Sequence, residues 1–199
     1  MLNLIELTHW TSRKSDYSNG VNETKSFKTF CEILKGEKYK VEGRGYTIKY
    51  EGRVLKGVQM ICFTERKASK KICTRFGTFG ISYKIESLID KGCLPAIYYS
   101  DVERRRIDPI LKHWVTNDSI NSNDLRLPYL MLSEPKKHSW QREWRLVLNI
   151  SKNTKKEVIY WKMENKHIST LRVPKKFKVE VEQLRDELGL QCKVITHLY

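Results

Sequence analysis

Gln141 to Arg145 is the stretch of this sequence best suited to chemistry, because it places an amide, a carboxylate and a guanidinium at alternate positions. On a β-strand the side chains of Gln141, Glu143 and Arg145 point to one face. A carboxylate and an amide on one face can both hydrogen-bond the same ligand. A simpler interpretation stays open, in which Glu143 only pairs with a neighbouring arginine at the start of a surface strand.

His9, Trp10 and Thr11 stand at the end of the first predicted strand. A histidine at the point where a strand runs into a polar loop is well placed to hydrogen-bond a ligand hydroxyl, and Thr11 lies on the same side of the strand. The alternative is a partly buried histidine that is hydrogen-bonded within the protein.

The third stretch, Arg75 to Tyr83, interleaves Gly77 and Gly80 with aromatic residues. Glycine lets a ligand approach the backbone closely, and an aromatic ring such as that of Phe79 or Tyr83 can stack on a flat heterocycle. The glycine spacing does not match the known phosphate-binding loops. A turn followed by core aromatic residues explains the same pattern.

Hydrophobic periodicity predicts the elements that position these residues. Strands are expected at residues 2–9, 58–63, 79–83, 94–99, 127–132, 144–150, 158–161, 168–173 and 192–198, with a hairpin through Tyr46, Ile48 and Tyr50. Helices are expected at residues 23–35, 85–89, 101–115 and 179–188. The interleaved order predicts one α+β domain over residues 1–199, built on a mixed or antiparallel sheet.

The chain has 199 residues and carries 38 Lys or Arg against 23 Asp or Glu, a formal net charge of +15. Its 40% of hydrophobic residues can form a core, which excludes disordered, collagen-like and coiled-coil proteins. An excess of positive charge destabilises a compact fold unless an anionic partner is met, so we expect RNA, DNA or an acidic protein as partner. The basic residues cluster at Arg66-Lys67 with Lys70-Lys71, at Arg104 to Arg106, at Lys136-Lys137, at Lys155-Lys156, and at Lys175-Lys176 with Lys178.

No apolar run approaches the ~18 residues of a membrane span, and Glu6 interrupts the apolar start. We therefore expect a cytoplasmic protein without membrane contact. The five cysteines are widely spaced and form no Cys-x-x-Cys pair, which argues against a disulfide framework or a bound metal. Cys31, Cys62 and Cys93 are expected to be buried thiols, and Cys73, which lies in a basic run, to be more reactive.

The order of these stretches resembles the ADP-ribosyltransferase superfamily, and within it the DarT-like and AbiGi-like abortive-infection proteins. Their outline is an early His-x-Thr, an Ile-Leu-x-Gly helix, a Cys-Phe strand and a Gly-aromatic-Gly-Ile segment. In this sequence these are His9 to Thr11, Ile33 to Gly36, Cys62-Phe63 and Gly77 to Ile81. The resemblance implies a split β-sheet core with flanking helices, and NAD as a substrate without a metal.

A histidine, an aromatic residue and a glutamate act together in that family. The resemblance assigns these roles to His9, Tyr83 and Glu143, with Phe79 and Phe63 as alternatives for the aromatic residue. Glu143 would stabilise the oxocarbenium-like state formed when nicotinamide leaves.

The other residues follow from the same resemblance. His9 would hold the adenosine-side ribose with a polar contact from Thr11, and Gln141 would hydrogen-bond the acceptor. Trp10, Arg75 and Phe79 complete the residues expected to bind NAD.

The implied function is a toxin that transfers ADP-ribose from NAD to RNA or DNA, guards bacteria against phage and is held in check by a neutralising antitoxin protein. A non-catalytic nucleic-acid-binding or antitoxin protein is the alternative, in which the charge is the whole function and Glu143 is structural. A metal-dependent nuclease needs clustered carboxylates, and only Glu134 and Glu157 stand near Glu143 in the sequence.

Overall fold

The computed structural model describes residues 6–11, 23–36, 38–42, 46–50, 53–100, 102–103, 133–151 and 158–199. The chain divides into two compact units. The first unit comprises Met1–Tyr39, Phe63–Asp90 and Lys162–Tyr199, and the second comprises Lys40–Cys62 and Lys91–Trp161. We describe each unit by itself.

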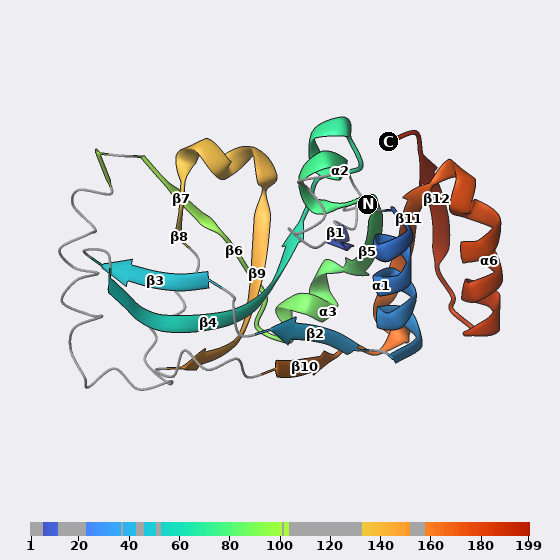
Figure 1. Cartoon of the computed structure of the whole chain (residues 1–199), viewed down its shortest axis with the longest axis horizontal. Helices are drawn as coiled ribbons and strands as arrows, with labels where there is room; N and C mark the ends of the chain where they lie inside the picture. Colours follow the sequence, from blue (N-terminus) through green and yellow to red (C-terminus); the bar gives the residue numbers. More distant parts are fainter. Residues whose placement is uncertain are drawn as a thin grey trace. The chain divides into compact units, whose positions relative to one another are not determined.

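The first unit is built on strands β1 (Glu6–Thr11), β5 (Phe79–Lys84), β11 (Ile168–Pro174) and β12 (Lys193–His197), which lie side by side in the order β12-β11-β5-β1 (Figure 1). β5 pairs antiparallel with both neighbours, in a register that sets Thr11 opposite Phe79 and Arg172 opposite Gly80. β11 and β12 are parallel. Parallel neighbours need a crossover, and α6 (Lys178–Glu187) supplies it.

An aromatic core covers one face of this sheet. In α1 (Glu23–Gly36), Phe30 and Leu34 are one helical turn apart and both are buried. The ring of Phe79 on β5 packs against Phe27 and Phe30, with centroid distances of 5.4 and 5.5 Å, and against Phe177, at 5.0 Å. Phe177 belongs to the 3-10 turn η4 (Lys175–Phe177), so this core joins α1 to the start of the crossover.

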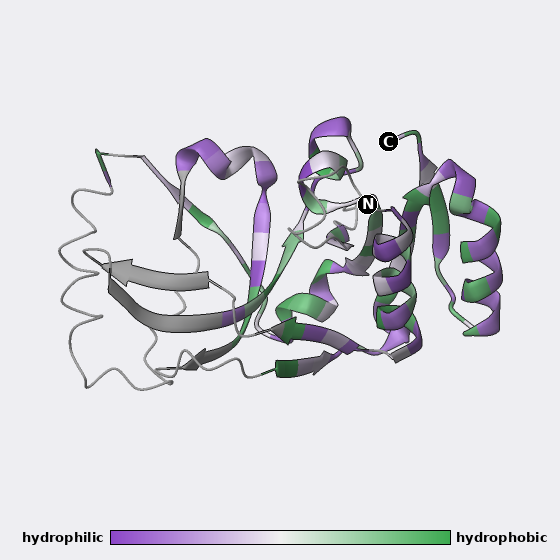
Figure 2. Ribbon diagram, in the orientation of Figure 1, coloured by the Kyte–Doolittle hydropathy of each residue, from purple (hydrophilic) through white to green (hydrophobic). Residues whose placement is uncertain are grey.

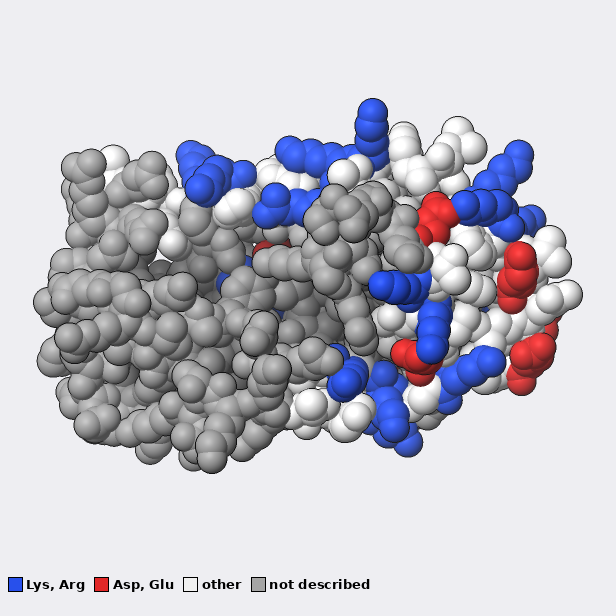
Figure 3. Space-filling view, viewed as in Figure 1, with Lys and Arg blue, Asp and Glu red and all other residues white. Residues whose placement is uncertain are grey.

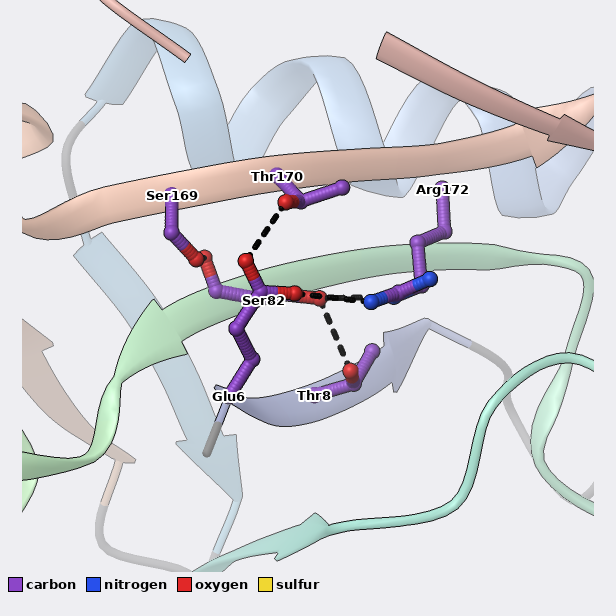
Figure 4. A network of polar contacts seen from close by, with 6 residues as sticks. All are labelled: Glu6, Thr8, Ser82, Ser169, Thr170 and Arg172. Carbon is purple, nitrogen blue, oxygen red and sulfur yellow. Dashed lines mark hydrogen bonds and ion pairs between the residues drawn. The ribbon is translucent and has the colours of Figure 1, made fainter. Parts of the chain in front are cut away.

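The other face of the same strands is polar although it is buried (Figure 4). The Arg172 guanidinium donates from Nη2 to Glu6 Oε2 at 2.7 Å and from Nε to Ser82 Oγ at 3.0 Å. Thr170 Oγ1 donates to Glu6 Oε1 at 2.8 Å, and the hydroxyls of Thr8 and Ser82 are 2.8 Å apart. We call this the Glu6–Arg172 network, and it links β1, β5 and β11.

Gly80 is required where this network meets Trp10. A Cβ atom on Gly80 would lie 2.7 Å from Thr8 Cγ2 and 3.0 Å from the Trp10 ring. The space above this glycine is therefore filled by side chains of β1. Close approach to the backbone explains the glycine, but the atoms that approach it belong to Thr8 and Trp10 and not to a ligand.

Short helices complete the first unit: α2 (Lys70–Phe76), α3 (Ile85–Ile89) and the 3-10 turn η3 (Asn165–His167). α2 contacts β1, and α3 follows directly from β5. Along α6, hydrophobic and hydrophilic residues alternate (Figure 2), and the buried ones are Val181 and Leu184. α6 therefore packs through one face, as an amphipathic crossover helix does.

The described part of the second unit contains strands of 2 to 12 residues and a 3-10 segment. They are β2 (Lys38–Glu42), β3 (Tyr46–Tyr50), β4 (Arg53–Thr64), β6 (Leu94–Pro95), β7 (Ile97–Tyr99), β8 (Ser133–Pro135), η2 (Lys136–Gln141), β9 (Glu143–Ser151) and β10 (Val158–Lys162). β3 and β4 form an antiparallel hairpin, β9 lies between β4 and β6, and β10 pairs with β2. β7 and β8 form a separate parallel pair. The first residues of β2 and the last residues of β4 and β10 belong to the first unit.

The mixed, mostly antiparallel arrangement of strands with helices confirms the coarse fold class expected from the sequence. The hairpin through Tyr46 to Tyr50 is also confirmed. The single strand expected at residues 94–99 is wrong: Pro95 cannot donate to a ladder, and the chain divides there into β6 and β7, which belong to different sheets. The helix expected at 101–115 lies outside the described residues except for 102 and 103, and the strand at 127–132 lies wholly outside them.

The Glu6–Arg172 network predicts a strong coupling between two strands that are distant in sequence. We expect Arg172→Met to lower the free energy of unfolding by about 3 kcal/mol, because removing one partner of a buried ion pair leaves the other unpaired. Glu6→Gln should cost less, since the Glu6 side chain is 28% exposed and that of Arg172 is 11% exposed. Urea unfolding of both single variants and of the double variant tests this, and the double variant should lose clearly less than the sum. Strict additivity would contradict the coupling.

Candidate functional site

Glu143 is the first residue of β9, and its carboxylate is held on both oxygens. Arg145 Nε lies 3.2 Å from Oε1 and Nη2 lies 3.2 Å from Oε2, so the guanidinium binds the carboxylate in a bidentate manner. Glu143 is 7% exposed and Arg145 is 3% exposed. The arginine pairing considered for Glu143 is therefore present, but the pair is buried and does not lie on the surface.

The backbone of Glu143 is fixed as firmly as its side chain. Its N–H donates to the Tyr98 hydroxyl at 2.7 Å, and its carbonyl accepts from the N–H of Ala96 at 2.8 Å. Together with the guanidinium contacts, these bonds set the direction of the carboxylate before any ligand is present. Preorganisation of this kind is what electrostatic catalysis needs.

The expectation that Gln141 shares a strand face with Glu143 is wrong. Gln141 ends η2, and Arg142 between them has a left-handed backbone with φ of 43°, which interrupts strand geometry. Gln141 is nevertheless buried, and its Nε2 lies 3.4 Å from Nδ1 of His138. An amide and a carboxylate close in sequence thus both lie in the interior of the second unit, from different elements.

His9 lies inside β1 and not at its end, because the strand continues to Thr11 and sets His9 opposite Ile81. Its half-buried ring belongs to a cluster with Tyr39, Phe63 and Tyr83. The His9 ring meets Tyr39 edge-on at 4.9 Å and Phe63 at 6.0 Å, and Phe63 lies 6.1 Å from Tyr83. We call these four residues the His9 cluster.

Two buried phenols close the His9 cluster. The hydroxyls of Tyr39 and Tyr83 are 2.6 Å apart and are hydrogen-bonded to each other. Burial raises the pKa of Tyr83 above its ordinary value, although the hydrogen bond from Tyr39 opposes this. Burial, and next the neighbouring Tyr83, raise the pKa of Tyr39. Both phenols are therefore neutral donors and acceptors at physiological pH.

Trp10 and Thr11 are both buried in β1. Thr11 Oγ1 donates to the Phe79 carbonyl at 3.1 Å, so its hydroxyl proton is already used in a hydrogen bond within the sheet. The Trp10 ring lies 6.0 Å from His197, whose Nε2 donates to the Thr78 carbonyl at 2.8 Å, and burial lowers the pKa of His197. Trp10 Nε1 and Thr78 Oγ1 are buried without a hydrogen-bond partner within the described part of the chain.

Arg75 and Phe79 are placed quite differently from each other. Phe79 is fully buried among phenylalanines, the position that the core-aromatic interpretation gave it. Arg75 is exposed in the last turn of α2, with its guanidinium 5.8 Å from the centre of the Phe76 ring.

The predicted residues divide between the two units. His9, Trp10, Thr11, Arg75, Phe79 and Tyr83 belong to the first unit, and Gln141 and Glu143 belong to the second. Within the first unit only His9 and Tyr83 share a side-chain cluster. Sequence reasoning missed Tyr39 and Tyr98, whose hydroxyls bond to Tyr83 and to the Glu143 backbone. Their role depends on contacts between distant segments, which a single sequence does not display.

The cysteines and acids give no metal site in the described ranges, where no group of three or more His, Cys, Asp or Glu side chains is arranged to hold an ion. All five cysteines are free thiols. Cys93 is buried, which raises its pKa to about 12, whereas Cys31 and Cys62 are half-buried. Cys73 is buried with a raised pKa, so the expectation of a more reactive thiol there is wrong. No helix among the described residues is long and apolar enough to cross a membrane.

Comparison with known proteins adds no relative: no family model, no curated protein and no solved structure matches this chain.

The Tyr39–Tyr83 pair predicts a specific loss of stability at high pH. Because folding raises both phenol pKa values, the stability from the pair is complete below the unfolded tyrosine pKa of about 10 and falls as pH rises above it. We expect Tyr39→Phe/Tyr83→Phe to show a smaller fall in melting temperature than the parent between pH 8 and pH 11. Thermal unfolding followed by circular dichroism measures the melting temperatures. An equal fall in both proteins would show that ionisation of these two phenols does not destabilise the folded state.

Proposed function

We propose that this protein is an ADP-ribosyltransferase that moves ADP-ribose from NAD to a nucleic-acid acceptor, RNA or DNA. The observation that carries the proposal is the buried Glu143 carboxylate, gripped on both oxygens by Arg145, in the motif that the sequence resemblance assigns to the catalytic glutamate. The resemblance also leads us to propose the split-sheet variant of the α+β fold for this chain.

The proposed reaction exchanges one bond at the anomeric carbon for another. The bond from C1′ of the ribose to nicotinamide breaks, and nicotinamide leaves with the electron pair. A nucleophilic atom of the acceptor then bonds to C1′ and loses its proton to solvent. Positive charge develops on the sugar between these events, and a fixed carboxylate stabilises it. Glu143 provides that charge and orients the ribose 2′-hydroxyl.

The remaining residues of the proposal are those that the resemblance assigns to NAD and to the acceptor. His9 holds the adenosine-side ribose, and Tyr83 is the aromatic residue that meets nicotinamide, since it shares the His9 cluster whereas Phe79 lies in the phenylalanine core. Thr11 supports the same substrate, and Gln141 hydrogen-bonds the acceptor.

The biological setting follows from the same resemblance. We place the protein in the cytoplasm, as a toxin of an anti-phage or toxin–antitoxin system that a neutralising partner protein restrains. A net charge of +15 suits a polyanionic acceptor, because phosphates release counterions when Lys or Arg neutralises them.

A second candidate is a non-catalytic nucleic-acid-binding or antitoxin protein. The Glu143–Arg145 pair favours it to the extent that both carboxylate oxygens already have a partner within the fold. In that case Glu143 is structural, and the positive charge is the whole function.

Glu143→Gln separates the two candidates. We expect the release of nicotinamide from NAD to fall by ~100-fold or more, because the change removes the charge that stabilises the transition state and keeps the side-chain volume. Nicotinamide is measured by chromatography, and growth arrest on expression should disappear in parallel.

Glu6→Gln is the matched control, since it makes the same substitution in a carboxylate–arginine pair of the first unit. It should keep nicotinamide release within about 3-fold of the parent. Equal losses in the two variants would mean that the Glu143 effect reports stability, and an unchanged Glu143→Gln variant would rule out the proposed role.

His9→Ala tests NAD binding apart from chemistry. A ligand that binds only the folded state raises the melting temperature by mass action. Millimolar NAD should raise that of the parent and of His167→Ala, a histidine of η3 outside the His9 cluster, and should raise that of His9→Ala much less. The absence of any shift in the parent would contradict a NAD site.

A further inference from the structure

The segment from Arg66 to the end of α2 is strongly basic on its surface. Five exposed cations occupy it, and the sequence contains no acid between Glu65 and Glu86. We call these residues the α2 surface: Arg66, Lys67, Lys70, Lys71 and Arg75. Figure 3 shows Lys and Arg side chains gathered over the position of α2, whereas Asp and Glu lie among the basic residues over α6.

Local bonds hold the α2 surface in a defined shape. Ser69 caps the helix, accepting from the N–H of Ile72 on its side chain and from the N–H of Cys73 on its carbonyl. Ile72 and Cys73 are buried, and Gly77 ends the helix with a φ of 105° that suits glycine. The N–H groups of Ile72 and Cys73 are therefore used within the fold, and α2 presents its cationic side chains to solvent.

α2 contains no acid, so none of its cations pairs with an acid inside the helix. α1 and α6 each carry an acid in the first turn and an ion pair one turn apart, Lys28–Glu32 and Lys178–Glu182. α2 has no acid in its first turn and begins with two lysines instead. Lys71 and Arg75 are like charges one turn apart, which destabilises a helix by a few tenths of a kcal/mol.

The composition of the α2 surface fits phosphates better than a protein or a lipid bilayer. Protein interfaces are centred on apolar and aromatic anchors, and amphipathic helices enter membranes through large apolar residues. The exposed large hydrophobic residues of the described chain include none between Arg66 and Leu88. Phosphate contacts need only cations.

We infer that the α2 surface binds the phosphodiester backbone of nucleic acid. The inference deepens the proposed function, on which it rests, by naming the surface that brings the acceptor to the enzyme. Lys67, Lys70 and Arg75 contact successive phosphates. Binding is independent of NAD.

The test is fluorescence anisotropy of the full chain with labelled oligothymidylate and oligouridylate of about 12 nucleotides, without NAD. The variant is Lys67→Gln/Lys70→Gln/Arg75→Gln. Each lost phosphate contact removes about 0.7 from the slope of log affinity against log salt, so the slope should fall by about 2. At low salt the affinity should fall at least ~10-fold. The affinities for DNA and for RNA should fall by the same factor, because the contacts are to phosphates. The polymer that the parent protein binds more tightly is then the natural one.

The matched control is Lys28→Gln/Lys166→Gln/Lys178→Gln, which removes the same charge from exposed lysines of the first unit that pair with acids. It should keep the parent's slope, and so should the charge-retaining Lys67→Arg/Lys70→Arg/Arg75→Lys. An equal loss in the control would assign binding to net charge and overturn the inference. Unchanged oligonucleotide binding with lost binding to phosphatidylserine vesicles would overturn it in favour of a lipid.

A measurement on the unaltered protein keeps the inference testable if the triple variant misfolds. Lysine acetylation read by mass spectrometry should show protection of Lys67 and Lys70 by the oligonucleotide, but not of Lys28. Absence of that protection would overturn the inference. Because no NAD is present, this failure is distinct from a failure of the proposed transferase, which nicotinamide release reports.

Discussion

The ion pair between Glu6 and Arg172 is the constraint on which the first unit depends. It joins β1 near the start of the chain to β11 near its end, and Ser82 of β5 lies between them as a shared hydrogen-bond partner. Buried charges are costly unless their partners are all in place, so only one register of the three strands satisfies them. That register also sets the opposite face: with Arg172 opposite Gly80 and Thr11 opposite Phe79, the odd residues of β1 and β5 must point toward α1 and Tyr39.

The His9 cluster is a consequence of that register. His9 and Tyr83 lie on the face opposite the Glu6–Arg172 network, where Tyr39 of β2 and Phe63 of β4 close around them. In the second unit the carboxylate of Glu143 is also paired with an arginine, but Arg145 belongs to the same strand as that carboxylate. Glu6 and Glu143 are thus both paired with arginine. The Glu6 pair links strands that are distant in the sequence, whereas the Glu143 pair fixes the position of the carboxylate within one strand.

Much of the secondary structure could be predicted, and the reasons for the failures are physical. The strands β5, β9, β11 and β12 and the helices α1 and α6 have long apolar periods, which a single sequence displays. α2 was missed because only Ile72 and Cys73 mark its buried face among lysines, and β2 was missed because five residues with Tyr39 and Val41 alternating give a weak pattern. For the site, the motif singled out Glu143 as a candidate, whereas its burial against Arg145, the turn at Arg142 and the phenol pair depend on tertiary packing. The roles of these residues in binding NAD stay predictions.

The proposed function requires that the protein cleaves NAD and passes ADP-ribose to nucleic acid. The most direct measurement is incubation of the purified full chain with NAD labelled in its adenine ring, together with DNA, RNA or protein extract in separate reactions, followed by separation of the polymers. We expect that nicotinamide is released and that label enters the DNA or the RNA pool. Label that enters only protein would contradict the nucleic-acid acceptor, and the absence of nicotinamide release from every mixture would contradict the transferase itself.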